Sequence, residues 1–333
     1  MYSHIYNPEN GKQYSLNNKQ GQLILKKYLV YLTGGGKCRH CGIKGHNITT
    51  CPMKKLTLEN ILWSKGPLQD EYSELNTETD SNKKTILDII KNADKVVFIR
   101  MGSYKRVTDL DTFAKYLHKL KNPIILITSD GDRSVPSSYS SKTVNKILNS
   151  NKIIRWQTQN YDKSIIHPKL RHHPIGFNLH TSRWLINEGI GDKIKFMISS
   201  RMKTKAIGVM KSLRKNSPVT NRISNRILCD THHARHHARQ RMYKMVKKNK
   251  LIDFTSKRQT FADITSKYNK YNFVLSPRGN GFDCHRTWEL FLAGVIVITR
   301  TSSLDEMYTK HNLPVVILDD WDELNTDLEN KLK

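Results

Sequence analysis

The sequence is poor in acidic residues and contains no long apolar run. It holds 29 Asp and Glu against 56 Lys and Arg, so its formal net charge is +27. So basic a chain attracts nucleic acid, anionic membranes, acidic glycans and sugar nucleotides, and charge alone does not choose among them. No stretch is long enough to span a bilayer, and the N-terminus lacks the apolar core of a signal peptide. We therefore expect no transmembrane segment and a soluble, cytoplasmic protein.

Cysteine is also scarce, which argues against a disulfide framework. Of the five cysteines, Cys229 and Cys284 are isolated and the other three lie in one short cluster. This distribution indicates a reducing compartment and metal chemistry. The cluster has the spacing C-x2-C-x4-H-x4-C, and its four candidate ligands are Cys38, Cys41, His46 and Cys51. Three thiolates and one imidazole satisfy tetrahedral Zn2+, so the spacing predicts a structural zinc knuckle at residues 37–53.

The partner of this knuckle stays open between two classes. Knuckles of the retroviral type bind single-stranded nucleic acid by stacking bases on aromatic side chains, commonly one just after the first cysteine. Here Arg39 occupies that position. An arginine can stack and contact phosphate, but the ring's stacking platform is lost. Single-stranded nucleic acid and a protein are therefore both expected partners.

The remaining chain predicts four further segments. Residues 1–33 combine a turn signal with a short amphipathic pattern, which fits either a docking piece for a partner or a helix packed on its neighbour. Residues 54–83 are polar and predict a linker. From residue 84 onward, apolar runs alternate with helical patterns, which indicates parallel sheets. We expect two α/β domains, at 84–188 and 189–333.

The first of these domains is expected to place polar residues at one sheet edge. Strands are predicted at 95–100 and 124–128, and Asp130 follows the second. Ligands bind at the carboxyl ends of parallel strands, so Asp130 and His180 should face a crevice. Asp130 could act as a general base on an acceptor hydroxyl, whereas the alternative is that Asp-Gly-Asp is only turn chemistry. His180 is a catalytic candidate with a similar structural alternative.

The second domain contains the most informative stretch, residues 271–299, which reads as strand, Gly-rich turn, helix from Asp283, and strand. Backbone N–H groups and a helix N-terminus at such a turn bind phosphate, so a nucleotide is the predicted ligand. Arginine suits diphosphate oxygens, and a carboxylate further along the helix can accept ribose hydroxyls. The alternative is an ordinary tight turn. The candidate nucleotide-binding residues are Arg278, Gly279, Asn280, Gly281, Asp283, His285, Arg286 and Glu289.

Three other patterns of this domain predict secondary structure. A strand is predicted at 195–199 and a helix at 205–213. A basic helix at 232–248 could bring Arg235 or Arg239 toward the nucleotide, although a solvated face is the simpler interpretation.

Two pairs of segments carry a family resemblance. SPRGNGFDCHRTWE (276–289) and LPVVILDDW (313–321), with HPKL (167–170) and PIGFNLHT (174–181), resemble exostosin-like glycosyltransferases over about residue 84 to the C-terminus. The resemblance implies an α/β fold of two facing Rossmann-like domains (GT-B type), here preceded by the zinc knuckle. It also implies hexosyl or glycosaminoglycan-type transfer from a UDP-sugar donor to an unknown glycan or protein acceptor.

By position, the resemblance assigns ribose binding to Glu289 and diphosphate binding to Arg278 and Arg286. Cellular exostosins are typically membrane-anchored, and this chain departs from that pattern. Residues 1–33 resemble a short N-terminal adaptor of large DNA viruses, which implies a virus-encoded chain. The alternative function is a nucleic-acid-binding or adaptor protein that acts through the knuckle and the basic surface, with a degenerate transferase fold.

Overall fold

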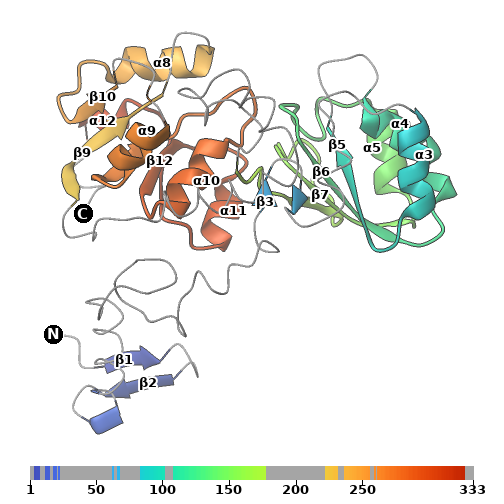
Figure 1. The fold of residues 1–333 in the computed structure, drawn as a ribbon, viewed down its shortest axis with the longest axis horizontal. Helices are drawn as coiled ribbons and strands as arrows, with labels where there is room; N and C mark the ends of the chain where they lie inside the picture. Colours follow the sequence, from blue (N-terminus) through green and yellow to red (C-terminus); the bar gives the residue numbers. More distant parts are fainter. Residues whose placement is uncertain are drawn as a thin grey trace. The chain divides into compact units, whose positions relative to one another are not determined.

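The chain divides into two compact units, Met1–Thr57 and Leu58–Lys333. In the first unit, β1 (His4–Asn7) pairs antiparallel with β2 (Lys12–Ser15), so two short strands flank the turn signal of residues 7–11 (Figure 1). The computed structural model describes residues 4–7, 12–15, 18–20, 22, 62–63, 66–67, 83–101, 108–177, 222–231, 236–255, 259 and 261–326. The strand predicted at 195–199 and the helix predicted at 205–213 lie outside these residues.

The second unit contains a four-stranded parallel sheet in the order β5-β6-β7-β8. Its strands are β5 (Val96–Arg100), β6 (Ile124–Ser129), β7 (Ile153–Thr158) and β8 (Leu170–His172). Its helices are α3 (Lys83–Asn92), α4 (Asp109–Tyr116), the short 3-10 helix η3 (Leu117–Lys119) and α5 (Ser141–Leu148). The parallel sheet and its strands at 95–100 and 124–128 are confirmed. A short antiparallel pair, β3 (Leu62–Trp63) and β4 (Gly66–Pro67), lies within the predicted linker.

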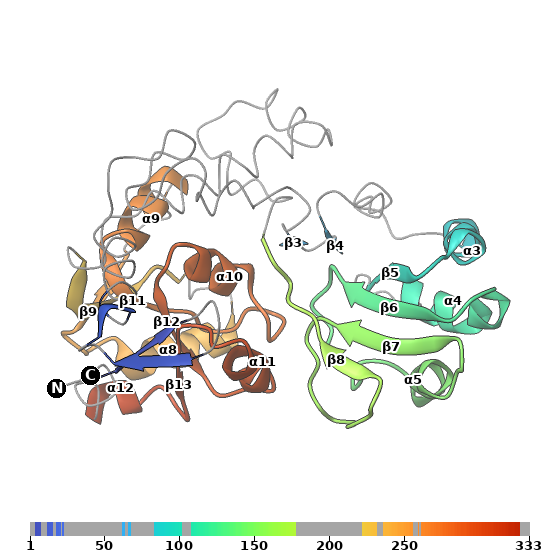
Figure 2. The ribbon, with the colours of Figure 1, turned by 90° about the horizontal axis from the view of Figure 1, so that it is seen from below.

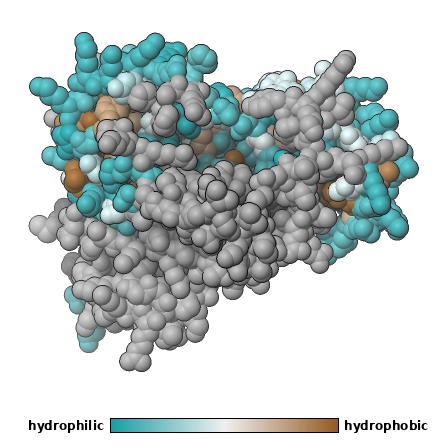
Figure 3. All heavy atoms as spheres, turned by 45° about the horizontal axis from the view of Figure 1, so that its top comes forward, coloured by the Kyte–Doolittle hydropathy of each residue, from teal (hydrophilic) through white to brown (hydrophobic). Residues whose placement is uncertain are grey.

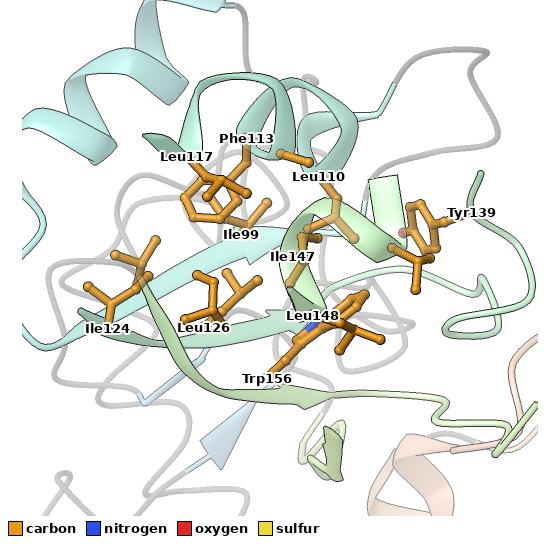
Figure 4. Close-up of a cluster of buried hydrophobic side chains, with 14 of the residues drawn as sticks. Ile99, Leu110, Phe113, Leu117, Ile124, Leu126, Tyr139, Ile147, Leu148 and Trp156 are labelled. Atoms are coloured by element: carbon orange, nitrogen blue, oxygen red, sulfur yellow. The ribbon is translucent and has the colours of Figure 1, made fainter. Parts of the chain in front are cut away.

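One apolar cluster joins this sheet to its helices. Figure 4 shows Phe113 of α4 and Ile147 of α5 pointing at Leu126 and Trp156 on the strands, and all four side chains are fully buried. The indole N–H of Trp156 is satisfied within the core, because it donates to Thr128 Oγ1 at 2.9 Å. Dense apolar packing with this polar group paired holds the helices against the sheet.

A five-stranded parallel sheet follows, in the order β10-β9-β11-β12-β13. Its strands are β9 (Ile223–Cys229), β10 (Ile252–Phe254), β11 (Tyr271–Leu275), β12 (Ile296–Arg300) and β13 (Val315–Leu318). Its helices are α8 (His237–Val246), α9 (Phe261–Tyr268), α10 (His285–Leu292), α11 (Asp305–Lys310) and α12 (Glu323–Thr326). Figure 2 shows how the strands and helices of this part follow one another.

Successive strand residues reach opposite faces of this sheet, as the pleat requires. Ile227 and Phe273 cluster with Met242 of α8, whereas Leu228 and Val274 cluster with side chains of α9 and α10. Helices therefore cover both faces. Parallel sheets with helices in this arrangement make the molecule a mixed α/β protein, consistent with a Rossmann-like fold.

The strand order of the five-stranded sheet reverses between β9 and β11. The chain first runs outward from β9 to β10 and then returns past β9 to β11. In doubly wound sheets a ligand binds at such a switch point, outside the carboxyl ends of the two strands. The predicted Gly-rich turn follows β11, so it lies at this switch point. Among the described helices, none is long and apolar enough to cross a membrane.

Candidate functional site

The Gly-rich turn connects Leu275, the last residue of β11, to His285, the first residue of α10. The predicted order of strand, turn, helix and strand is confirmed, although the helix begins two residues later than predicted. Its N-cap, Cys284, makes no side-chain capping bond. The Cys284 thiol instead accepts the N–H of Gly279, at 2.9 Å. The sulfur atom thus joins the end of the turn to Gly279, nearer its start.

Gly281 packs against Asn160, which follows β7 of the four-stranded sheet. A Cβ at position 281 would lie 2.6 Å from Asn160 Nδ2 and 2.8 Å from its Oδ1, so any larger residue would displace the Asn160 side chain. Asn160 also accepts the backbone N–H of Asp283, at 2.8 Å. Next to this contact, Asn280 Nδ2 donates to Asp132 Oδ2 at 3.1 Å. Residues that follow the carboxyl ends of β6 and β7 therefore touch the turn.

Asp283 and His285 hold the segment that follows β8. Asp283 Oδ2 accepts the N–H of Ile175 at 2.7 Å, and its Oδ1 accepts Trp288 Nε1 at 2.8 Å. His285 Nδ1 lies 2.7 Å from the carbonyl of Gly176, and because a carbonyl only accepts, Nδ1 carries the proton. Complete burial raises the pKa of Asp283 to about 7, although the N–H donors partly oppose this rise. Asp283 and His285, which were both predicted to bind the nucleotide, therefore contact other protein groups in this structure.

Arg286 spans the switch point. Its Nε lies 3.2 Å from Asp230 Oδ1, and its Nη1 donates to Thr231 Oγ1 at 2.8 Å. Asp230 and Thr231 directly follow β9, and the Tyr268 hydroxyl donates to the other Asp230 oxygen at 2.8 Å. The exposed fractions of the Arg286 and Asp230 side chains are only 12% and 3%. Arg286 is therefore fixed and its charge is balanced by Asp230.

Arg239, in the first turn of α8, lacks such a balance. Its Nε donates to the carbonyl of Arg278 at 3.1 Å, and its Nη2 would lie 3.2 Å from a Cβ at Gly279. Among the residues that the structure describes, no carboxylate forms an ion pair with Arg239. Burial, and then the charge of Arg286, lower its pKa. An anion bound beside Gly279 would relieve this repulsion.

The turn offers two further groups to an anion. Arg278 is exposed, with its guanidinium carbon 4.3 Å from the centroid of the Phe282 ring and its Nη2 donating to the carbonyl of Asn280. No acceptor among the described residues binds the backbone N–H groups of Asn280 and Gly281. In proteins, arginines and backbone N–H donors gathered at one turn can bind phosphate oxygens.

Glu289, the predicted ribose ligand, lies one turn further along α10. Its side chain is almost completely buried, with an exposed fraction of 1%. The helix does place the carboxylate on the same element as His285 and Arg286. Ribose binding by Glu289 stays a prediction.

Asp130, the candidate base, lies at the carboxyl end of β6 in the left-handed region, with φ of 61°. Its Oδ2 lies 3.1 Å from Arg100 Nε, and its N–H donates to Gln159 Oε1. The ion pair engages one of the two carboxylate oxygens of Asp130. The other catalytic candidate, His180, lies outside the described residues, as does Arg235.

The four predicted zinc ligands, Cys38, Cys41, His46 and Cys51, also lie outside the described residues. Within the part that is described, no group of three or more His, Cys, Asp or Glu side chains could hold a metal ion. The zinc knuckle therefore stays a prediction from the spacing.

Sequence reasoning missed Asp230 and Thr231. The available signal was their position directly after the apolar run of β9, because polar residues after a parallel strand belong to its ligand-binding edge. Comparison with models of known protein families gives no match for this chain, and no curated protein matches it either.

Proposed function

We propose that the chain is a glycosyltransferase that moves a sugar from a UDP-sugar to a glycan or protein acceptor, with two facing Rossmann-like domains of the GT-B type. The observation that carries this proposal is the guanidinium of Arg239, which has no carboxylate partner among the described residues and lies beside Gly279 at the switch point. The resemblance of residues 276–289 to exostosin-like enzymes supports the same donor.

Catalysis would rest on stabilising the leaving diphosphate. Arg239, Arg278 and the N–H groups of the turn supply positive charge where the bond from sugar to phosphate breaks. Such preorganised donors stabilise developing charge strongly, because they need no reorientation during the reaction. Arg286 acts mainly by fixing the start of α10 against Asp230. Glu289 would accept hydroxyls of the ribose.

The acceptor would enter from the four-stranded sheet. Asp132 and Asn160 already touch the donor turn, so the carboxyl edge of that sheet lies next to the proposed diphosphate site. Asp130 lies at the same edge, two residues before Asp132. It would deprotonate the acceptor hydroxyl.

The test is release of UDP from a panel of UDP-sugars, with and without mixed glycan acceptors. We expect the wild type to turn over at least one donor. Arg239→Ala should lower kcat by about 100-fold, because it removes a donor to the leaving group. The control is Arg241→Ala on the same helix, whose exposed guanidinium binds Asp320 at 2.6 Å instead. Absence of turnover by the folded wild type with every donor and acceptor, or equal rates for both variants, would contradict the proposal.

A further inference from the structure

A second cationic feature lies on the helices of the four-stranded sheet. A surface hollow of about 470 Å3 opens between α4 and α5. Three lysines line it, namely Lys115 of α4 and Lys142 and Lys146 of α5, and all three are exposed. Lys142 and Lys146 are four residues apart and so share one helix face. None of the residues of the proposed donor site lines this hollow.

The carboxylate in this hollow is already used by the fold. Asp111 Oδ2 accepts both the N–H and the hydroxyl of Thr108, at 2.9 and 2.8 Å, which closes the capping box of α4. Its Oδ1 accepts the hydroxyl of Thr143 at 2.7 Å. A carboxylate with three such bonds holds the two helices together.

Asp111 lines the same hollow, so its carboxylate offsets part of the charge of the three lysines without pairing with any of them. No ion pair that joins described residues includes Lys115, Lys142 or Lys146. The ammonium of Lys115 lies 5.5 Å from the centroid of the Tyr116 ring, so an aromatic face helps to hold this charge at the hollow. Three ammonium groups around one hollow, one of them placed against an aromatic ring, are suited to bind an anionic ligand.

We propose that this hollow binds the phosphodiester backbone of single-stranded nucleic acid. Lysine ammonium groups act as point charges toward phosphate. Unlike the planar guanidinium of arginine, they do not require the phosphate oxygens to lie in a fixed orientation. The Cβ atoms of Lys142 and Lys146 are about 5–6 Å apart, as one helix turn dictates, which allows them to meet successive phosphates of an extended strand. The hollow opens at the surface between α4 and α5, so an extended strand can lie across it. Recognition is by charge and leaves the base sequence unread.

The test is fluorescence anisotropy with a labelled RNA of ~12 nucleotides, a length within the usual range of single-strand sites. The variant is the triple Lys115→Ala, Lys142→Ala, Lys146→Ala in the full, zinc-loaded chain. Its control is the triple Lys244→Ala, Lys247→Ala, Lys248→Ala, which removes equal charge from exposed positions of another helix region. We expect the first triple to bind about tenfold more weakly or worse at ~0.1 M salt, and to lower the log–log salt slope by about 2.

The control triple should change affinity less than about twofold, and the triple Lys→Arg variant at the hollow should retain binding because the charge is kept. Equal weakening by both alanine triples would overturn the proposal, since a diffuse basic field would then suffice. An unchanged affinity of the hollow triple would overturn it as well. If heparin oligosaccharides outcompete the RNA and only their binding depends on these lysines, the hollow belongs to acidic glycans instead.

Discussion

At Gly281, the turn between β11 and α10 approaches Asn160 so closely that an added Cβ would force Asn160 to move. Asn160 cannot retreat easily, because its amide is bonded to Gly131 and Asp283. We expect Gly281→Ala to lower the free energy of unfolding by about 1–3 kcal/mol, the usual cost of overpacking. Urea denaturation followed by fluorescence measures this change.

Gly279→Ala is the matched control for this prediction. Its Cβ would meet the end of the Arg239 side chain at 3.2 Å and the Cys284 sulfur at 3.3 Å. A guanidinium tip can move by a few tenths of an ångström, so the free energy of unfolding should fall less than in Gly281→Ala. Equal losses for the two variants would contradict the tight contact with Asn160.

Asp283 should make the folded state depend on pH. Burial raises the pKa of its carboxyl group from the ordinary 3.8 to about 7, because it disfavours the charged form. Between about pH 4 and pH 7 the folded state therefore binds more protons than the unfolded state. The contribution of Asp283 to stability is then greatest at low pH and falls as pH rises, by at most about 1.4 kcal/mol per pH unit.

Asp283→Asn removes this titration and is nearly isosteric. The free energy of unfolding of Asp283→Asn should be lower than that of the wild type, and this deficit should shrink as pH rises from 5 to 7. Denaturant titrations of both proteins at several pH values measure the difference. A deficit that stays constant or grows over this range would show that the carboxylate is already ionised in the folded chain.

The residues of the site were only partly predictable. The sequence placed Arg278, Gly279 and Gly281 at the turn, because one contiguous stretch carries the pattern. It did not show that Asp283 and His285 bind Ile175 and Gly176, since these contacts join residues more than 100 positions apart.

At the scale of elements, long apolar runs were predictable and short or polar elements were not. The runs at 95–100 and 124–128 became strands of a parallel sheet, as predicted. Helix α5 was missed, because SKTVNKIL buries only part of one face and its remainder is polar. Strand β8 was not predicted, because its three residues give too short a pattern.

The zinc knuckle is the element whose prediction rests on spacing alone. We expect the chain, purified under reducing conditions, to contain one zinc ion, because three thiolates and one imidazole complete a tetrahedral site. Cys51→Ser should reduce zinc content, measured by atomic emission, and chelators should remove the metal from it more readily.

Cys284→Ser is the control for the knuckle, because this thiol binds Gly279 in the proposed donor site. Its zinc content should equal that of the wild type. A wild type without zinc, or the same zinc content in Cys51→Ser, would contradict the knuckle and remove the structural basis for a nucleic-acid partner there.

At the scale of the whole molecule, residues that follow the carboxyl ends of the four-stranded sheet contact residues that follow the carboxyl ends of the five-stranded sheet. Asn280 bonds Asp132, and Lys163 pairs with Glu306 of α11 at 2.6 Å. The described surface seen in Figure 3 is mainly hydrophilic, in keeping with a net charge of +27. A basic surface attracts many anions to the protein. Specific binding is therefore shown by its loss when residues of the site are substituted and by its persistence at higher salt concentration.

The most direct measurement is calorimetric titration of UDP and UDP-sugars into the wild type, Arg239→Ala and Arg241→Ala at ~0.15 M salt. We expect wild-type dissociation constants on the order of micromolar. Arg239→Ala should bind at least about tenfold more weakly, because a charge-assisted bond to the diphosphate is lost, whereas Arg241→Ala should bind as the wild type does. Absence of binding by the folded wild type, or equal affinities for the two variants, would contradict a donor site at this turn.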